Sequence, residues 1–228
     1  ELPCVVINVT RGGPGLGTIQ PSQSDYFQAT KGGAHGDFHL IVLAPNSVQE
    51  MHDFVFDAFD LAFKYRNPVM ILSDGVIGQM MEKVVLADQR PRRTAEEIIA
   101  QDGDWALTGK TADRKEHVIT SLELDPYAQE RFNEKLIAKY AKIRENEVRY
   151  EEFMTEDADY IIVAFGSAAR ICRMTVEMAR EAGYKVGLVR PITLYPFPSK
   201  VLHGLAARGV KGFLSAELNH GQMVEDVR

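Results

Sequence analysis

Short apolar runs alternate with longer segments of mixed polarity along most of the 228-residue chain. The runs are bounded by Gly, Pro or Asp and are rich in Val, Ile, Leu and Phe, a pattern typical of buried strands. They predict strands at residues 4–9, 38–44, 69–72, 160–165, 186–189 and 211–216. The segments between them predict helices at residues 23–30, 48–65, 125–153, 168–181, 199–208 and 224–228. This alternation indicates an α/β protein with two parallel, doubly wound sheets covered by helices on both faces.

Two of the predicted helices have an apolar stripe that should face a sheet. In the helix at 48–65, the stripe consists of Val48, Met51, Val55, Ala58, Phe59 and Ala62. Phe54, Phe56 and Leu61 lie outside this stripe, so we expect the helix to be covered on more than one side. In the helix at 168–181, the stripe consists of Ala168, Ile171, Cys172, Thr175, Met178 and Ala179, and it continues to Ala182 just after the helix.

The hydrophobic pattern is weak in the middle of the chain. Charges and turn residues dominate from Lys83 onward, which predicts a connecting segment with one short strand near Val118. The basic run at residues 90–93 has acidic neighbours, and we expect solvated surface or a contact with a partner subunit there. Neither reading makes this run an anion site.

A long, exposed helix is predicted to close the middle segment. Asp125 is a good cap and Pro126 a good first helical residue, and no strong breaker follows before Phe153. Its apolar stripe is narrow and consists of Phe132, Leu136, Tyr140 and Ile143. We therefore divide the chain into residues 1–82, a linker with this helix at 83–156, and residues 157–228.

The loop at residues 10–22 carries the clearest candidate for chemistry. It follows the first predicted strand, is rich in Gly and Pro, and contains one charged residue, Arg11. Ligands of parallel sheets gather at the carboxyl ends of the strands, and a guanidinium there can hold a carboxylate or phosphate by paired hydrogen bonds. The alternative is a plain surface charge. Gly13, Gly15 and Gly17 do not form a GxGxxG or P-loop pattern, so dinucleotide binding is not supported.

Three other polar groups near strand ends are weaker candidates. Asp74 in the loop at 73–78 shares the edge with Arg11, but Asp-Gly after a strand favours a turn or helix cap. Gly166-Ser167 forms the kind of turn that commonly joins a strand to a helix in α/β proteins, which favours a turn over a nucleotide-binding loop. Glu217, Asn219 and His220 form a polar cluster that could face a partner or coenzyme A, and we assign it no role.

Composition narrows the class of protein. Hydrophobic residues make up 45% and charged residues 25%, with a net charge of -6, which does not favour a nucleic-acid surface. No apolar run reaches the length of a membrane span, and no export signal is present. Two cysteines without CxxC spacing and six histidines without HExxH predict free thiols in the cytoplasm and no metal site. The chain starts directly before a strand and stops in a helix, so we expect a fragment cut at both ends.

Four separated motifs resemble a known family. INVTRGGPGLGT, SQSD, LAPNSVQEM and PVMILSDG occur in this order between residues 7 and 75. They are similar to the α-type subunit of multi-chain thiamine-dependent 2-oxoacid:ferredoxin oxidoreductases, in the branch acting on 2-ketoisovalerate or 2-oxoglutarate. KVGLVRPITLYPFP at residues 185–198 resembles the C-terminal domain of the transketolase group, whose role is mainly to stabilise the assembly.

The resemblance implies a function shared between chains. Residues 1–82 would be the rear part of a thiamine diphosphate pyrimidine-binding domain, and Arg11 matches the family arginine that helps to hold the 2-oxoacid carboxylate. The activating glutamate and a substrate-binding threonine of the family would lie before Glu1. The resemblance places the diphosphate and its magnesium on a β-type subunit and the iron-sulfur clusters on further subunits. Coenzyme A and ferredoxin would be reaction partners, and this fragment alone would be inactive.

Two rival functions stay open on these residues. The first is another thiamine-dependent enzyme, a transketolase-like protein or a 2-oxoacid dehydrogenase subunit. The second is a non-catalytic structural subunit whose loop has lost its ligand.

Overall fold

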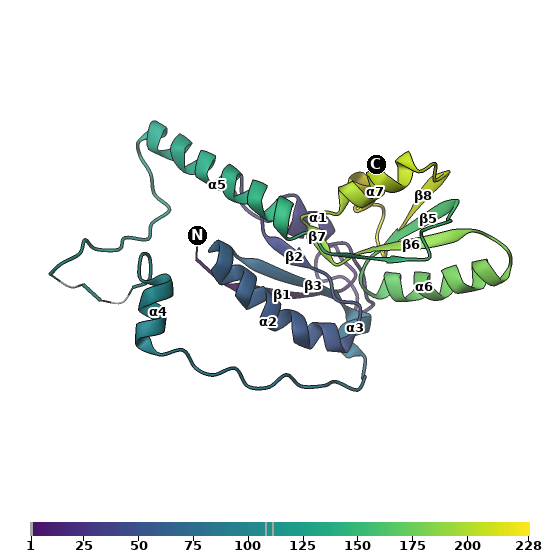
Figure 1. The fold of residues 1–228 in the computed structure, drawn as a ribbon, viewed down its shortest axis with the longest axis horizontal. Helices are drawn as coiled ribbons and strands as arrows, with labels where there is room; N and C mark the ends of the chain where they lie inside the picture. Colours follow the sequence, from purple (N-terminus) through teal and green to yellow (C-terminus); the bar gives the residue numbers. More distant parts are fainter. Residues whose placement is uncertain (1, 108, 111) are drawn as a thin grey trace. The chain divides into compact units, whose positions relative to one another are not determined.

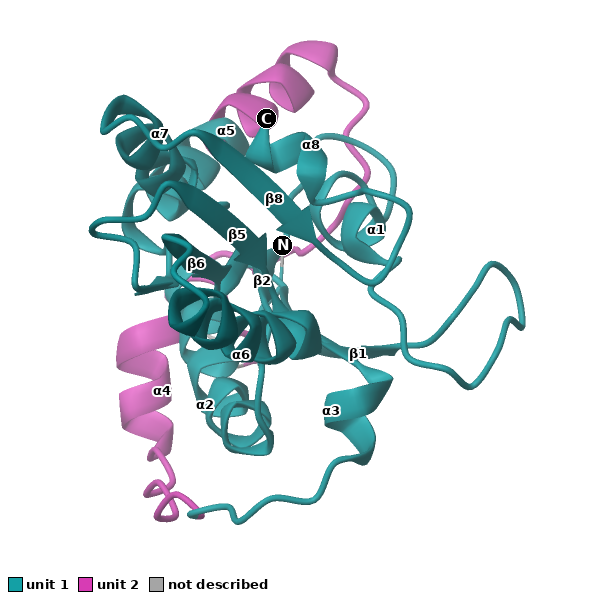
Figure 2. Ribbon diagram, turned by 90° about the vertical axis from the view of Figure 1, so that its right-hand side faces the viewer, with its two compact units in different colours: residues 1–85, 136–228 teal, residues 86–135 magenta. Residues whose placement is uncertain are grey.

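The computed structural model describes residues 2–107, 109–110 and 112–228. The chain separates into two compact units, residues 1–85 with 136–228, and residues 86–135 (Figure 2). The larger unit contains two four-stranded sheets flanked by helices (Figure 1). This architecture confirms the α/β class predicted from the alternation of apolar runs.

The first sheet carries the candidate loops. Its strands lie in the order β1 (Val5–Thr10), β3 (Val69–Asp74), β2 (Ile41–Leu43) and β7 (Thr193–Tyr195). The first three are parallel, and the register pairs Thr10 with Asp74, so the loops after β1 and β3 leave the sheet side by side. The fourth strand, β7, is antiparallel to β2 and had no counterpart in the sequence prediction.

The strand β1 is less buried than its composition predicts. It lies at the edge of its sheet, and Ile7 and Val9 are exposed, as is Cys4 before it. The prediction of a buried strand is therefore wrong for β1, because the described residues place a paired strand on one side of it alone. The central strand β3 is buried along its whole length, as predicted.

The helix α2 (Val48–Tyr65) has the predicted bounds. The Ser47 hydroxyl accepts the backbone N–H of Glu50 at 3.1 Å, which caps the first turn. Its buried residues are Phe54, Ala58, Leu61 and Ala62. Ala58 and Ala62 confirm part of the predicted stripe, whereas Phe59 of that stripe is exposed. Phe54 and Leu61, placed outside the stripe by the prediction, belong to the buried face. Positions 54, 58, 61 and 62 form their own row at three- and four-residue spacing, and this row meets the sheet.

The second sheet is built from the C-terminal residues. Its order is β4 (Tyr150–Phe153), β6 (Val186–Pro191), β5 (Tyr160–Ala164) and β8 (Gly212–Ala216), with β4 alone antiparallel. Helices α6 (Gly166–Glu181), α7 (Ser199–Ala207) and α8 (Val224–Val227) follow β5, β7 and β8. In α6, Ala168, Ala169, Cys172 and Val176 are buried, whereas Ile171 and Met178 of the predicted stripe are exposed.

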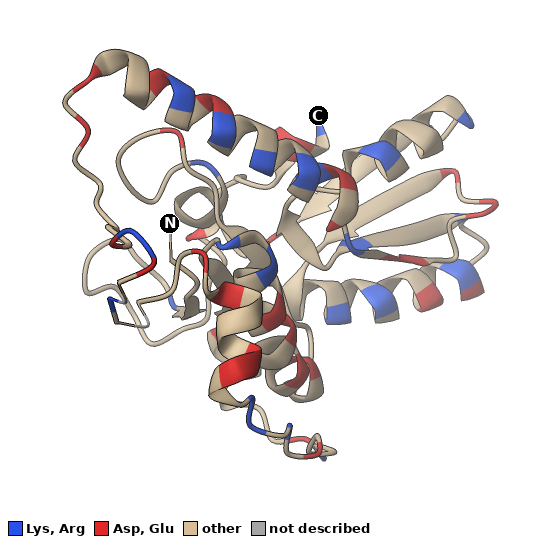
Figure 3. Ribbon diagram, turned by 60° about the vertical axis from the view of Figure 1, so that its left-hand side comes forward, with Lys and Arg blue, Asp and Glu red and all other residues tan. Residues whose placement is uncertain are grey.

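The long helix α5 is shorter than predicted. It spans Pro126–Asn146, with Asp125 accepting the backbone N–H of Tyr127 at 3.0 Å, and carries charges of both signs (Figure 3). The prediction that it reaches Phe153 is wrong, because residues 150–153 form β4. Glu147, just after the helix, is buried and accepts hydrogen bonds from Lys64 Nζ at 2.6 Å and the Tyr65 hydroxyl at 2.5 Å.

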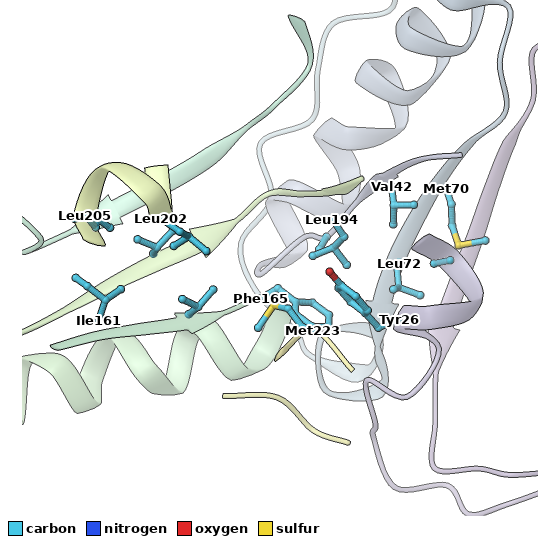
Figure 4. Packing of buried hydrophobic residues seen from close by; sticks show 14 residues of the cluster. Tyr26, Val42, Met70, Leu72, Ile161, Phe165, Leu194, Leu202, Leu205 and Met223 are labelled. Atoms are coloured by element: carbon cyan, nitrogen blue, oxygen red, sulfur yellow. The ribbon is translucent and has the colours of Figure 1, made fainter. Parts of the chain in front are cut away.

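One hydrophobic cluster joins the two sheets of the larger unit (Figure 4). Tyr26, Val42 and Leu72 from the N-terminal residues pack in the same cluster as Phe165 and Met223 from the C-terminal residues. Residues of both sheets therefore share a core. The division at residues 82/83 and 156/157 stays a prediction.

The smaller unit, residues 86–135, contains one helix that the sequence reading missed. Helix α4 (Ala95–Asp102) begins with a capping box between Thr94 and Glu97. The Arg93 guanidinium donates to Gln101 Oε1 at 2.8 Å. The strand expected near Val118 is absent from the described residues, and that prediction is wrong.

The remaining short helices are α1 (Tyr26–Thr30) and α3 (Gly75–Gln79). Among the described residues, no helix has both the length and the hydropathy to cross a bilayer.

Candidate functional site

Arg11 begins an arm at the carboxyl end of β1. Residues 11–21, here called the arm, form a narrow hairpin whose base is a β-bridge between Arg11 and Pro21. The backbone N–H of Gly12 donates to the Gln20 carbonyl at 2.8 Å. Arg11 is exposed, and its guanidinium has no hydrogen-bond or ion-pair partner among the described residues. Its charge is therefore available to an acidic ligand.

The glycines of the arm close the hairpin on itself. Gly17 has a φ of +60°, and a Cβ there would lie 1.8 Å from the Gly12 carbonyl oxygen. The Thr18 N–H donates to this same Gly12 carbonyl at 2.7 Å. The glycines thus serve a close approach within the arm.

Asp74 is a helix cap, as the sequence favoured. One carboxylate oxygen accepts the backbone N–H groups of Val76 at 3.0 Å and Ile77 at 3.3 Å. The other accepts the N–H of Ser167 at 3.1 Å. The side chain is 1% exposed and both of its oxygens accept backbone N–H groups, so Asp74 organises this edge of the sheet.

Two buried hydroxyls beside Asp74 keep unused hydrogen-bonding capacity. Thr10 Oγ1 and Ser73 Oγ have no partner among the described residues, although both side chains are almost fully buried. They end β1 and β3, where parallel sheets bind ligands. Both hydroxyl oxygens are closed off from solvent, so a polar group of a cofactor would satisfy them only if it entered this buried edge of the sheet. The described residues hold no cluster of three or more His, Cys, Asp or Glu that could bind a metal ion.

Gln23 is the buried polar residue that sequence reasoning missed. Its side chain donates to the Phe165 carbonyl at 2.9 Å and accepts the N–H of Leu218 at 3.0 Å. Its backbone N–H donates to the Leu218 carbonyl at 2.9 Å. The polar residues at 22–25 predict a helix start, and no local signal indicates hydrogen-bond partners 142 and 195 residues away.

The cluster of Glu217, Asn219 and His220 is mainly structural. The Glu217 carboxylate accepts the backbone N–H groups of Gln222 at 3.1 Å, Met223 at 2.7 Å and Val224 at 3.1 Å. Burial opposes ionisation, but these hydrogen bonds outweigh it and lower the pKa of Glu217 below its usual value. Glu217 thus holds the turn before α8, and the structure gives it no free oxygen for a partner.

A cavity of about 510 Å³ lies elsewhere in the larger unit. His39 stacks on Tyr195 with ring centroids 4.4 Å apart, and Arg144 Nη1 donates to the Tyr195 hydroxyl at 3.3 Å. Burial and the charge of Arg144 lower the pKa of His39. No residue of the arm or of the loop at 73–78 lines this cavity, so it is separate from the candidate site.

Two family models match the chain. Residues 1–152 match the model described as pyruvate flavodoxin/ferredoxin oxidoreductase, thiamine diphosphate-binding, and residues 158–228 match pyruvate:ferredoxin oxidoreductase core domain II. Arg11, the arm and Asp74 all fall within the first match.

Curated relatives and a solved structure are similar over the whole chain. The ketoisovalerate oxidoreductase subunit VorB of Methanothermobacter marburgensis is 51% identical over 100% of this chain and 62% of its own length. The 2-oxoglutarate synthase subunit KorA of Methanocaldococcus jannaschii is 34% identical over 100% of this chain and 65% of its own length. The 228 residues therefore span less than two thirds of these relatives.

The solved structure is the 2-oxoglutarate:ferredoxin oxidoreductase from Magnetococcus marinus with 2-oxoglutarate, coenzyme A and succinyl-CoA bound. It superposes with a TM-score of 0.78 at 26% identity, covering 99% of this chain and 43% of that one.

Proposed function

The chain belongs to the pyruvate flavodoxin/ferredoxin oxidoreductase family of thiamine diphosphate-binding proteins, and from this premise we propose that it is part of the α-type subunit of a 2-oxoacid:ferredoxin oxidoreductase. The complete complex converts a 2-oxoacid and coenzyme A into acyl-coenzyme A, carbon dioxide, a proton and two electrons. Ferredoxin accepts the electrons through iron-sulfur clusters on other subunits.

The observation that carries this proposal is the free guanidinium of Arg11 at the carboxyl edge of a thiamine-family sheet. A carboxylate is the common feature of all 2-oxoacids, and the planar fork of arginine matches it with two parallel hydrogen bonds. The exposed arm presents this fork to ligand. Arg11 thus orients the substrate and neutralises its charge.

The chain's own residues fit only part of the cofactor site. Thiamine diphosphate, when bound, supplies the centre at which the carboxylate leaves as carbon dioxide. Thr10 and Ser73 offer hydroxyls at the edge where it would lie. The diphosphate and its magnesium belong to the β-type subunit in this proposal. We therefore expect the 228-residue chain alone to be inactive.

A branched-chain 2-oxoacid such as 2-ketoisovalerate is the proposed substrate, with 2-oxoglutarate as the alternative. Identity is 51% to the ketoisovalerate relative and 34% to the 2-oxoglutarate relative, which supports this order. Arg11 is the single charged residue of the arm, and one cation suits one carboxylate.

The experiment compares electron acceptors and substrates in the purified complete complex. We expect reduction of ferredoxin with 2-ketoisovalerate and coenzyme A, and kcat/KM for 2-ketoisovalerate above that for 2-oxoglutarate. Reduction of NAD without ferredoxin would instead assign the chain to a dehydrogenase. Purification without a thiamine-bearing or iron-bearing partner would favour a structural subunit.

The two free cysteines support a proposed location of the complex in the cell. Both cysteines are free, Cys4 exposed and Cys172 buried. Free thiols fit a reducing compartment, and we place the complex in the cytoplasm.

A further inference from the structure

We propose that Gln23 is a positioning residue for the 2-oxoacid carboxylate, because it fixes the base of the arm that carries Arg11 to the C-terminal residues 158–228. This inference rests on the proposed role of Arg11 and adds a function to the C-terminal domain. For that domain, the family resemblance implies mainly a role in stabilising the assembly.

Gln23 forms several hydrogen bonds to residues of the C-terminal domain. The side chain is 2% exposed, and both of its polar atoms are used, toward Phe165 and Leu218. The backbone of the same residue donates to the Leu218 carbonyl at 2.9 Å and accepts from Asn219 Nδ2 at 2.9 Å. Four hydrogen bonds from one buried residue fix the chain firmly at this point.

Gln23 is connected to Arg11 through only a few residues. Pro21 forms the β-bridge with Arg11, and Gln23 follows Pro21 by two residues. Ser22 between them donates its hydroxyl to the Leu218 carbonyl at 3.2 Å. The chain is therefore attached to the C-terminal residues at Ser22 and Gln23, immediately after the arm ends.

The strand β1, which leads into the arm, is also attached to residues that follow the arm. Asn8 in β1 donates its side-chain N–H to Asp25 Oδ2 at 2.9 Å. A Cβ added at Gly75 would lie 3.5 Å from Pro21 Cα, so the start of α3 packs against the base of the arm. Both strands of the hairpin are thus oriented by residues 22–25 and their partners.

The turn at residues 165–167 completes the attachment. Gly166 has a φ of +56°, and a Cβ there would lie 2.8 Å from Gln23 Nε2 and 3.1 Å from Asp74 Oδ2. The absence of a side chain lets Gln23 approach the Phe165 carbonyl while Asp74 holds the Ser167 N–H. The start of α6 is therefore held between the base of the arm and the end of β3.

The arm itself supplies little additional restraint. Beyond its base it is largely exposed and is closed by the bond between the Thr18 N–H and the Gly12 carbonyl. Its direction is consequently set at the base, and loosening Gln23 widens the range of positions of the Arg11 guanidinium. A carboxylate clamp that acts in the ground state and the transition state alike affects KM more than kcat.

The experiment uses the assembled complex with Gln23→Leu, which keeps the volume and removes both hydrogen-bonding groups. We expect KM for the 2-oxoacid to rise about tenfold, equivalent to about 1.4 kcal/mol, with kcat within about twofold and KM for coenzyme A unchanged. Amide hydrogen exchange at Gly12 and Thr18 should accelerate, which reports the arm without using activity.

Tyr26→Phe is the matched control. It removes the hydroxyl that donates to Asp226 Oδ2 at 2.5 Å, another bond between N-terminal and C-terminal residues, but touches no part of the arm. Asp226 keeps its ion pair with Lys31. We expect this variant to leave KM and exchange in the arm unchanged. An equal rise in KM for both variants would overturn the positioning role.

Two further variants separate this inference from the proposed function. If Arg11→Ala does not raise KM, the role of Arg11 fails. If Arg11→Ala raises KM and Gln23→Leu does not, the inference alone fails. Where Gln23→Leu does not assemble, Gln23→Glu keeps an acceptor for Leu218 but replaces the donor to Phe165 with a carboxylate oxygen, which the Phe165 carbonyl and the nearby Asp74 carboxylate repel. The same KM and exchange results are required of this variant. In the Arg11→Ala background, the Gln23 variant should raise KM little further.

Discussion

The backbone N–H of Ser167 donates to the carboxylate of Asp74 at 3.1 Å, across 93 residues of sequence. The same carboxylate caps α3, so one buried side chain fixes the end of β3 and the starts of two helices. The edge that carries Arg11 is therefore built from both halves of the larger unit.

Removing the Asp74 carboxylate should destabilise the protein strongly. Asp74→Ala leaves three backbone N–H groups without an acceptor, and we expect a loss of about 2–4 kcal/mol in the free energy of unfolding. Asp74→Asn keeps one acceptor oxygen and should lose less. Urea unfolding of the full-length protein measures both. Equal stability of wild type and Asp74→Ala would contradict the capping role.

Gly166→Ala should lower the stability of the protein more than the same substitution at Gly183, another glycine with positive φ. Gly166→Ala adds a contact at 2.8 Å with Gln23 Nε2 to the strain of its backbone conformation. Gly183→Ala, with a φ of +89° and no atom within 4 Å of the new Cβ, carries the strain alone. We expect Gly183→Ala to cost about 1–2 kcal/mol and Gly166→Ala about 1–3 kcal/mol more. Thermal unfolding of the pair tests this order.

The buried charge of Arg190 should depend on one carboxylate. Arg190 is 2% exposed, and its guanidinium forms a bidentate ion pair with Glu50 and a further contact of 3.0 Å with Glu151. Glu50→Gln leaves the buried charge poorly compensated and should cost about 3 kcal/mol. The Glu151 side chain is 49% exposed. Glu151→Gln should therefore lower the free energy of unfolding by under about 1 kcal/mol. Similar losses for the two variants would contradict this account.

Acid should remove the contribution of Glu217. Its pKa is lowered in the folded protein from the ordinary value of 4.5, so its ionised form stabilises the fold above that value. The contribution is lost as the pH falls below 4.5 through the lowered pKa. Glu217→Gln should therefore be less stable than wild type at pH 7, with a difference that shrinks on acidification. A difference independent of pH would show that the carboxylate charge is not involved.

The sequence predicted the elements that have clear periodicity and end signals. The bounds of α2, the cap at Asp74 and the start of α5 at Pro126 are confirmed. The family resemblance carried by the motifs at residues 7–75 is also confirmed by the match over residues 1–152. In these places local propensity and tertiary packing agree.

The failures have identifiable physical causes. Residues 147–153 are charged and lack a breaker, so they favour a helix locally, but pairing with β6 makes residues 150–153 a strand. The capping box at Thr94 and Glu97 was a readable signal for α4. The sequence around Gln23 has no signal for its role, because its partners Phe165 and Leu218 become its neighbours only in the folded protein.

The most direct test of the account is the KM for the 2-oxoacid of the assembled complex carrying Arg11→Lys. Lysine keeps the charge and loses the planar fork, so we expect KM to rise at least about tenfold while KM for coenzyme A stays constant. Arg11→Ala should raise it further. An unchanged KM for the 2-oxoacid in a complex with full cofactor content would remove Arg11 from the substrate site and contradict the central claim.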